Sequence, residues 1–99
     1  MKLELLIESL LSNELESTIP FAITFLKENM FVKAKFYEGD LLMTVLAINE
    51  SFWTRNQDQW KEIIEVLEIQ ESRITEQEVS FEMKVDWYEK IERFKSISF

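Results

Sequence analysis

The chain has 99 residues, with 19 Asp and Glu against 11 Lys and Arg, and its formal net charge is −8. It contains no His and no Cys, so it lacks the usual general base near neutral pH, a thiolate nucleophile and the ligands of most zinc sites. We therefore expect no catalytic residues, no bound metal and no cofactor, and instead a protein that acts by binding. A hydrolase with paired carboxylates is the remaining enzymatic alternative, and it would need a Glu with a raised pKa.

The size and composition predict one globular domain over residues 1–99. Hydrophobic residues make up 46% of the chain and aromatic residues 13%, which is enough for a core. A single Gly and a single Pro leave no room for a flexible linker. The longest apolar runs, such as 41–48, are too short to cross a membrane, and Glu4 and Glu8 interrupt the apolar run that a signal peptide needs. We therefore expect a cytoplasmic protein that does not bind membranes.

Two helices are predicted at the N-terminus. In the first, apolar residues recur at a spacing of three or four, which predicts a helix over 2–15: Leu3, Leu6, Ile7, Leu10 and Leu11. The second is predicted over 19–30, because a hydroxyl residue shortly before Pro20 is typical of a helix start. Apolar residues also alternate within 19–25, so a short strand is an alternative there.

Three stretches predict strands. From residue 31 the apolar period changes to two, which predicts a strand over 31–37, and the only glycine, Gly39, then stands where a hairpin turn needs a positive φ. The apolar run 41–48 is expected to be the central return strand. Alternating apolar and polar residues over 78–86 predict a third strand with one buried face. Together these stretches predict an antiparallel sheet of about three strands.

Two further helices complete the predicted fold. A helix near 57–69 carries an apolar stripe at helical spacing, made of Trp60, Ile63, Ile64 and Leu67. A closing helix is expected to begin at Trp87, and of the adjacent Trp87 and Tyr88 we expect one to be exposed. The predicted fold class is therefore α+β, a small single domain whose antiparallel sheet packs with the N-terminal helices, the helix near 57–69 and the C-terminal helix.

No short motif for a phosphate, a metal or a nucleic acid is present. A phosphate-binding loop needs clustered glycines, and Glu38-Gly39-Asp40 lacks the alternating oxygen ligands of a calcium loop. Nucleic acid is disfavoured as a partner, because phosphate binding relies on Lys and Arg and this chain is strongly acidic. We interpret Lys33 and Lys35 as the solvated face of an edge strand.

The acidic residues are concentrated in one segment. Between Glu62 and Glu82 there are seven acidic residues and one basic residue, Arg73. A solubilising surface is one interpretation. The functional interpretation is an interface with a basic protein, in which charge guides association and selects the partner. The candidate contact residues are Glu62, Glu65, Glu68 and Glu71.

A second candidate lies just upstream, in Phe52-Trp53-Thr54-Arg55. Trp and Arg dominate binding hot spots when a partner buries them, so Trp53 and Arg55 are candidate anchors. The alternative is that Phe52 and Trp53 cover the end of the core, since aromatic side chains are usually buried for their apolar area.

The profile of a small, acidic, cysteine-free α+β domain is similar to that of bacterial immunity proteins that neutralise toxic nucleases. The similarity is one of type and involves no particular residues, so it implies no functional positions. We hypothesise a stoichiometric inhibitor, most simply an immunity protein, that is monomeric until it blocks the active cleft of a basic toxin domain. A phage-type inhibitor of a host nucleic-acid enzyme has the same physical profile. A self-associating adaptor is a further alternative, and it would associate independently of salt.

Overall fold

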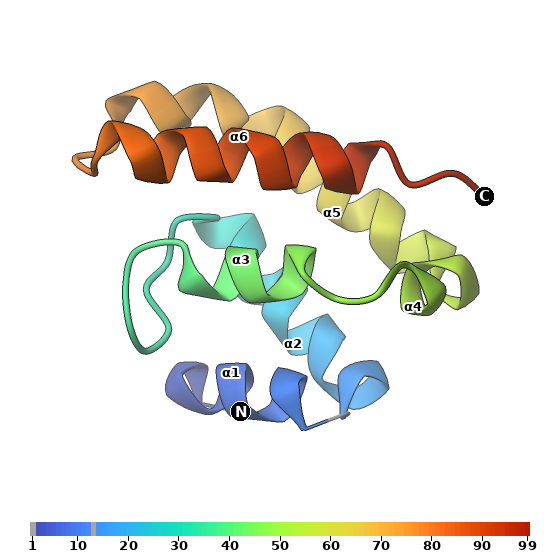
Figure 1. Ribbon diagram of the computed structural model, residues 1–99. Coiled ribbons are helices and arrows are strands. Elements are labelled where there is room, and N and C mark those ends of the chain that lie inside the picture. The colour runs from blue at the N-terminus through green and yellow to red at the C-terminus, as the bar shows by residue number, and fades with distance from the viewer. Residues whose placement is uncertain (1, 13) are drawn as a thin grey trace.

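The computed structural model describes residues 2–12 and 14–99, and this part of the chain is helical (Figure 1). Its elements are α1 (Leu3–Leu11), α2 (Leu15–Glu28), α3 (Asp40–Leu46), α4 (Glu50–Arg55), α5 (Gln57–Gln70), the 3₁₀ helix η1 (Glu71–Glu76) and α6 (Phe81–Lys95). No strand forms in the described residues, where β pairing is limited to an isolated bridge between Lys33 and Glu38. The predicted α+β class, with its antiparallel sheet, is therefore wrong.

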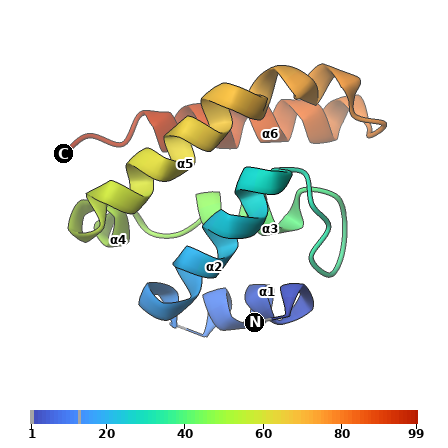
Figure 2. The ribbon, with the colours of Figure 1, turned by 180° about the vertical axis from the view of Figure 1, so that it is seen from behind.

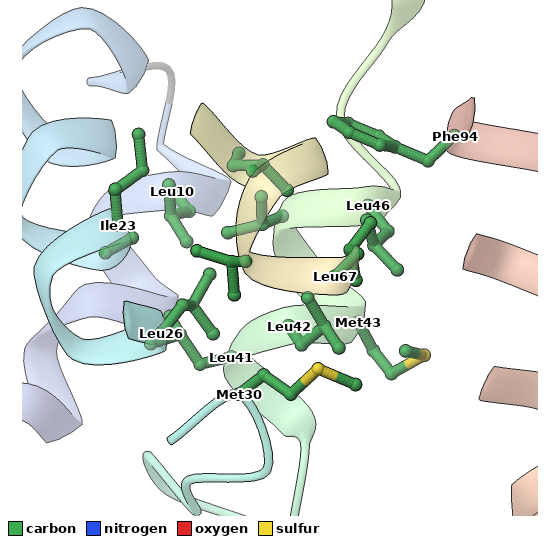
Figure 3. Close-up of a cluster of buried hydrophobic side chains, with 14 of the residues drawn as sticks. Leu10, Ile23, Leu26, Met30, Leu41, Leu42, Met43, Leu46, Leu67 and Phe94 are labelled. Atoms are coloured by element: carbon green, nitrogen blue, oxygen red, sulfur yellow. The ribbon is translucent and has the colours of Figure 1, made fainter. Parts of the chain in front are cut away.

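The predicted central strand 41–48 is instead α3, the helix at the centre of the core. Its apolar residues are buried on every side, and they are Leu41, Leu42, Met43, Val45 and Leu46. Helices α1, α2 and α6 all contact α3, which lies between α1 and α6 (Figure 1). Figure 3 shows Leu41 and Leu42 next to Leu26 and Met30. A helix that is surrounded needs no polar face, so its sequence resembles that of a buried strand.

The predicted strand 78–86 is also wrong, because α6 begins within it at Phe81. The hydroxyl oxygen of Ser80 accepts a hydrogen bond from the Met83 N–H at 3.1 Å and so caps the start of the helix. Phe81 is then 76% exposed, whereas Trp87, Ile91 and Phe94 form the buried face of α6. The expected C-terminal helix is present but starts earlier than Trp87, and Tyr88 is the exposed member of the adjacent aromatic pair.

The remaining helix predictions agree with the structure. The helix near 57–69 is α5, and the two N-terminal helices are α1 and α2, although α1 ends at Leu11 and α2 already begins at Leu15. Pro20 lies inside α2, so the strand alternative for 19–25 does not hold. No helix in the described part of the chain combines the length and apolar character that crossing a membrane requires.

The predicted strand 31–37 forms a loop, which the buried side chain of Asp40 organises. The Asp40 carboxylate is 2% exposed and accepts hydrogen bonds from the backbone N–H groups of Ala34 at 2.7 Å, Lys35 at 2.9 Å and Phe36 at 2.7 Å. Gly39 has φ +84°, so its predicted positive φ is confirmed without the hairpin. Because no edge strand exists here, the interpretation of Lys33 and Lys35 as edge-strand residues is also wrong, although both are exposed.

Replacing Asp40 with asparagine should lower the free energy of unfolding by about 2 kcal/mol at pH 7, because buried N–H groups lose a charged acceptor. Burial raises the pKa of Asp40, but the hydrogen bonds from the Phe36, Ala34 and Lys35 N–H groups outweigh it and hold the pKa below its ordinary value. The stabilisation is therefore complete above about pH 4, the unfolded pKa, and is lost as the pH falls through the folded pKa.

Urea denaturation at a series of pH values would measure this effect, with Asp86→Asn on the exposed face of α6 as the matched control. The difference between the wild-type protein and Asp40→Asn should shrink as the pH falls from about 5 to 2. A constant difference over that range would show that the carboxylate charge is not what stabilises the loop.

Candidate interaction surface

The outward face of α5 carries the central part of the predicted acidic surface. Ile63, Val66 and Leu67 are buried against the core, so the helical period turns Glu62, Glu65 and Glu68 away from it. Glu65 and Glu68 are exposed and Glu62 is half-buried. Figure 2 shows α5 in front of α6 and running alongside α2, which it contacts. We call the surface formed by Glu62, Glu65 and Glu68 the α5 acidic face.

The structure does not place Glu71 on the same face. Glu71 begins η1, and its carboxylate lies 2.7 Å from the Lys95 Nζ of α6, with both side chains about one-third exposed or less. Glu62 forms a more open ion pair with Lys27 of α2 at 3.3 Å. Glu65 and Glu68 form no ion pair within the described residues. Their charges are therefore the ones most available to a partner.

Trp53 is a core residue. It has no exposed surface, and its ring centroid lies 5.0 Å from that of Phe52 and 5.2 Å from that of Phe94. The structure thus favours the alternative in which Phe52 and Trp53 cover the end of the core, and it removes Trp53 from the residues that a partner can touch.

Arg55 is exposed at the end of α4, where its Nε donates a hydrogen bond to the Ser51 carbonyl oxygen at 3.3 Å. It precedes the N-terminal end of α5, whereas Glu65 and Glu68 lie toward the other end of that helix. Arg55 is therefore accessible to a partner, but it stands apart from the main concentration of carboxylates.

Ile69 is an exposed apolar residue that the sequence interpretation missed. It is 77% exposed and lies beside the α5 acidic face. With Lys27 of α2 and four other residues of α5 it borders a groove of about 190 Å³, whose lining residues are Lys27, Glu62, Glu65, Val66, Ile69 and Gln70. The sequence indicates only that Ile69 lies off the apolar stripe of α5. It does not indicate the groove, because the groove depends on how α2 packs against α5.

The arrangement of these side chains suits protein binding. Among residues 2–12 and 14–99 no three acidic side chains come close enough together to hold a metal ion. An exposed row of carboxylates on a helix beside an apolar side chain has the composition of a protein interface, with charge for association and apolar surface for affinity.

Comparison with known proteins places the chain in a family. No curated protein and no solved structure shows significant similarity to it. A family model described as CDI immunity proteins matches residues 4–63, which is more than half of the chain. The match runs from α1 into α5 and includes Glu62 but ends before Glu65. The chain therefore belongs to the family of CDI immunity proteins, and its function is to neutralise a toxin.

Proposed function

We propose that this immunity protein acts without catalysis of its own, by covering the active cleft of a basic, nuclease-type toxin domain with the α5 acidic face. The observation that carries the proposal is the exposure of Glu65 and Glu68, which form no ion pair in the described part of the chain. The surrounding segment from Glu62 to Glu82 holds seven acidic residues against one basic residue.

The cleft of a nuclease must bind the phosphates of a nucleic acid. Such a cleft is lined with Lys and Arg, because it neutralises the phosphates of its substrate. A helix face with carboxylates one turn apart presents negative charge of similar density, so it competes for the same cations. Charge complementarity of this kind raises the association rate and selects against partners of the wrong sign.

The free protein also has an expected oligomeric state and cellular location. A net charge of −8 makes copies of the chain repel one another, so we propose that it is monomeric until it meets the toxin. We further propose that it acts in the cytoplasm, where a toxic nuclease finds its nucleic-acid substrates. We propose Arg55 as a contact at the edge of the interface. Glu71 can contact the toxin only after its ion pair with Lys95 opens.

The test is capture of the toxin by the tagged protein from a lysate of the source organism, with elution by increasing salt. The captured toxin is then assayed for cleavage of DNA and RNA with and without the immunity protein. We expect one basic toxin in a 1:1 complex that high salt releases, and nuclease activity that stops at equimolar immunity protein. A toxin with an acidic surface, or one that leaves nucleic acids intact, would contradict this proposal but not the family assignment.

A further inference from the structure

The groove between α2 and α5 combines charge and apolar surface in one small site. Glu62 and Glu65 supply carboxylates at its rim, and Val66 and the exposed Ile69 supply the apolar part. This combination matches a long basic side chain, whose charged end requires carboxylates and whose hydrocarbon stem gains from apolar contact.

A cation of the protein itself already reaches this site. The Lys27 Nζ lies 3.3 Å from Glu62 Oε1, and the two side chains are 55% and 45% exposed. An ion pair as open as this one contributes little to stability, because water and salt screen it. A cation from a partner can therefore replace Lys27 without disturbing the fold.

The two helices that border the groove are held together before any partner arrives. The Gln70 side chain is 5% exposed, and its Nε2 donates hydrogen bonds to the carbonyl oxygens of Leu26 at 2.8 Å and Lys27 at 3.2 Å. Its Oε1 accepts a hydrogen bond from the Met30 N–H at 2.8 Å. Gln70 thus ties the C-terminal end of α2 to α5, so the backbone on both sides of the groove loses little conformational entropy when the groove is filled.

We propose that the groove receives one arginine side chain of the toxin, and that Lys27 is the internal cation which this arginine displaces. The guanidinium group binds between Glu62 and Glu65, and its stem packs on Ile69. Arginine fits better than lysine, because its planar group donates to two carboxylates at once and is more weakly hydrated beside an apolar side chain. The inference rests on the proposed function, since it requires a basic toxin.

The experiment measures toxin association and dissociation rates for Lys27→Met and for the matched control Lys61→Met. Each variant removes one positive charge near the α5 acidic face, but Lys61 does not line the groove. Both should speed association by a similar factor. Only Lys27→Met should also slow dissociation, by about threefold, because the toxin arginine no longer competes with Lys27. Ile69→Ala should speed dissociation by about tenfold while the melting temperature stays unchanged.

The identity of the toxin residue follows from replacing the surface arginines of the toxin one at a time. One replacement should abolish the difference between Lys27→Met and Lys61→Met. Equal dissociation rates for the two Lys variants, together with wild-type binding by Ile69→Ala, would overturn the groove proposal. If Glu65→Gln and Glu68→Gln still slow association in that case, the proposed function survives. Unchanged rates for all of these variants would contradict the proposed function as well.

Discussion

Trp53→Ala should lower the free energy of unfolding by about 3–5 kcal/mol, the usual cost of truncating a buried Trp to Ala. The Trp53 side chain has no exposed surface and meets the rings of Phe52 and Phe94 edge to face. Its removal leaves a cavity where α4 packs near the end of α6. The edge-to-face contacts of Trp53 with Phe52 and Phe94 are lost as well. Urea denaturation followed by circular dichroism measures this loss.

Two further variants separate packing from other effects. Phe81→Ala removes an aromatic ring that is 76% exposed, so it should change the stability by less than about 0.5 kcal/mol. Trp53→Phe should cost clearly less than Trp53→Ala, because it keeps most of the apolar volume and removes a buried Nε1–H that has no hydrogen-bond partner in the described residues. If the Trp53→Ala variant were as stable as the wild-type protein but bound the toxin weakly, Trp53 would belong to the interface instead.

An apolar pattern specifies a helix or a strand only where one side of the element is polar. The helix near 57–69 was predictable, because its apolar residues follow the helical period on one side only. The run 41–48 was not, because a helix buried on all sides and a buried strand share a continuous apolar sequence. Within 78–86 apolar and polar residues alternate as they do in a strand. Two features favour a helix instead: Ser80 caps its start, and Trp87, Ile91 and Phe94 follow at helical spacing.

The loop before α3 shows a second limit. Residues 31–37 alternate as a strand does, but the side chain of Asp40 satisfies three of their backbone N–H groups, and this replaces a neighbouring strand. Sequence periodicity contains no information about such a contact. The only local sign of it was Gly39, whose positive φ was correctly expected.

The candidate surface was predictable to the extent that it depends on a single helix. The positions of Glu62, Glu65 and Glu68 follow from helical spacing alone. Glu71 differs because its partner, Lys95, comes from α6, and the role of Ile69 differs because the groove needs α2. Contacts between elements distant in sequence decide which charges remain available, and the sequence does not specify those contacts directly.

The triple variant Glu62→Gln, Glu65→Gln, Glu68→Gln should slow association with the toxin by about tenfold or more at low salt. Glutamine keeps the size and the helix propensity of glutamate, so the variant removes charge with little change in packing. The salt dependence of the association rate should flatten as well, since screening acts only on the charges that remain. Stopped-flow mixing at several salt concentrations measures both effects.

The matched control is Glu4→Gln, Glu14→Gln, Glu16→Gln, three exposed acids in or next to α1 and α2. Both triple variants remove three negative charges and so change the net charge from −8 to −5. A slower association of the α5 variant alone would therefore assign the effect to the place of the charges and not to their number. Equal slowing by both variants would mean that the total charge of the protein attracts the toxin, and the α5 acidic face would then lose its special role.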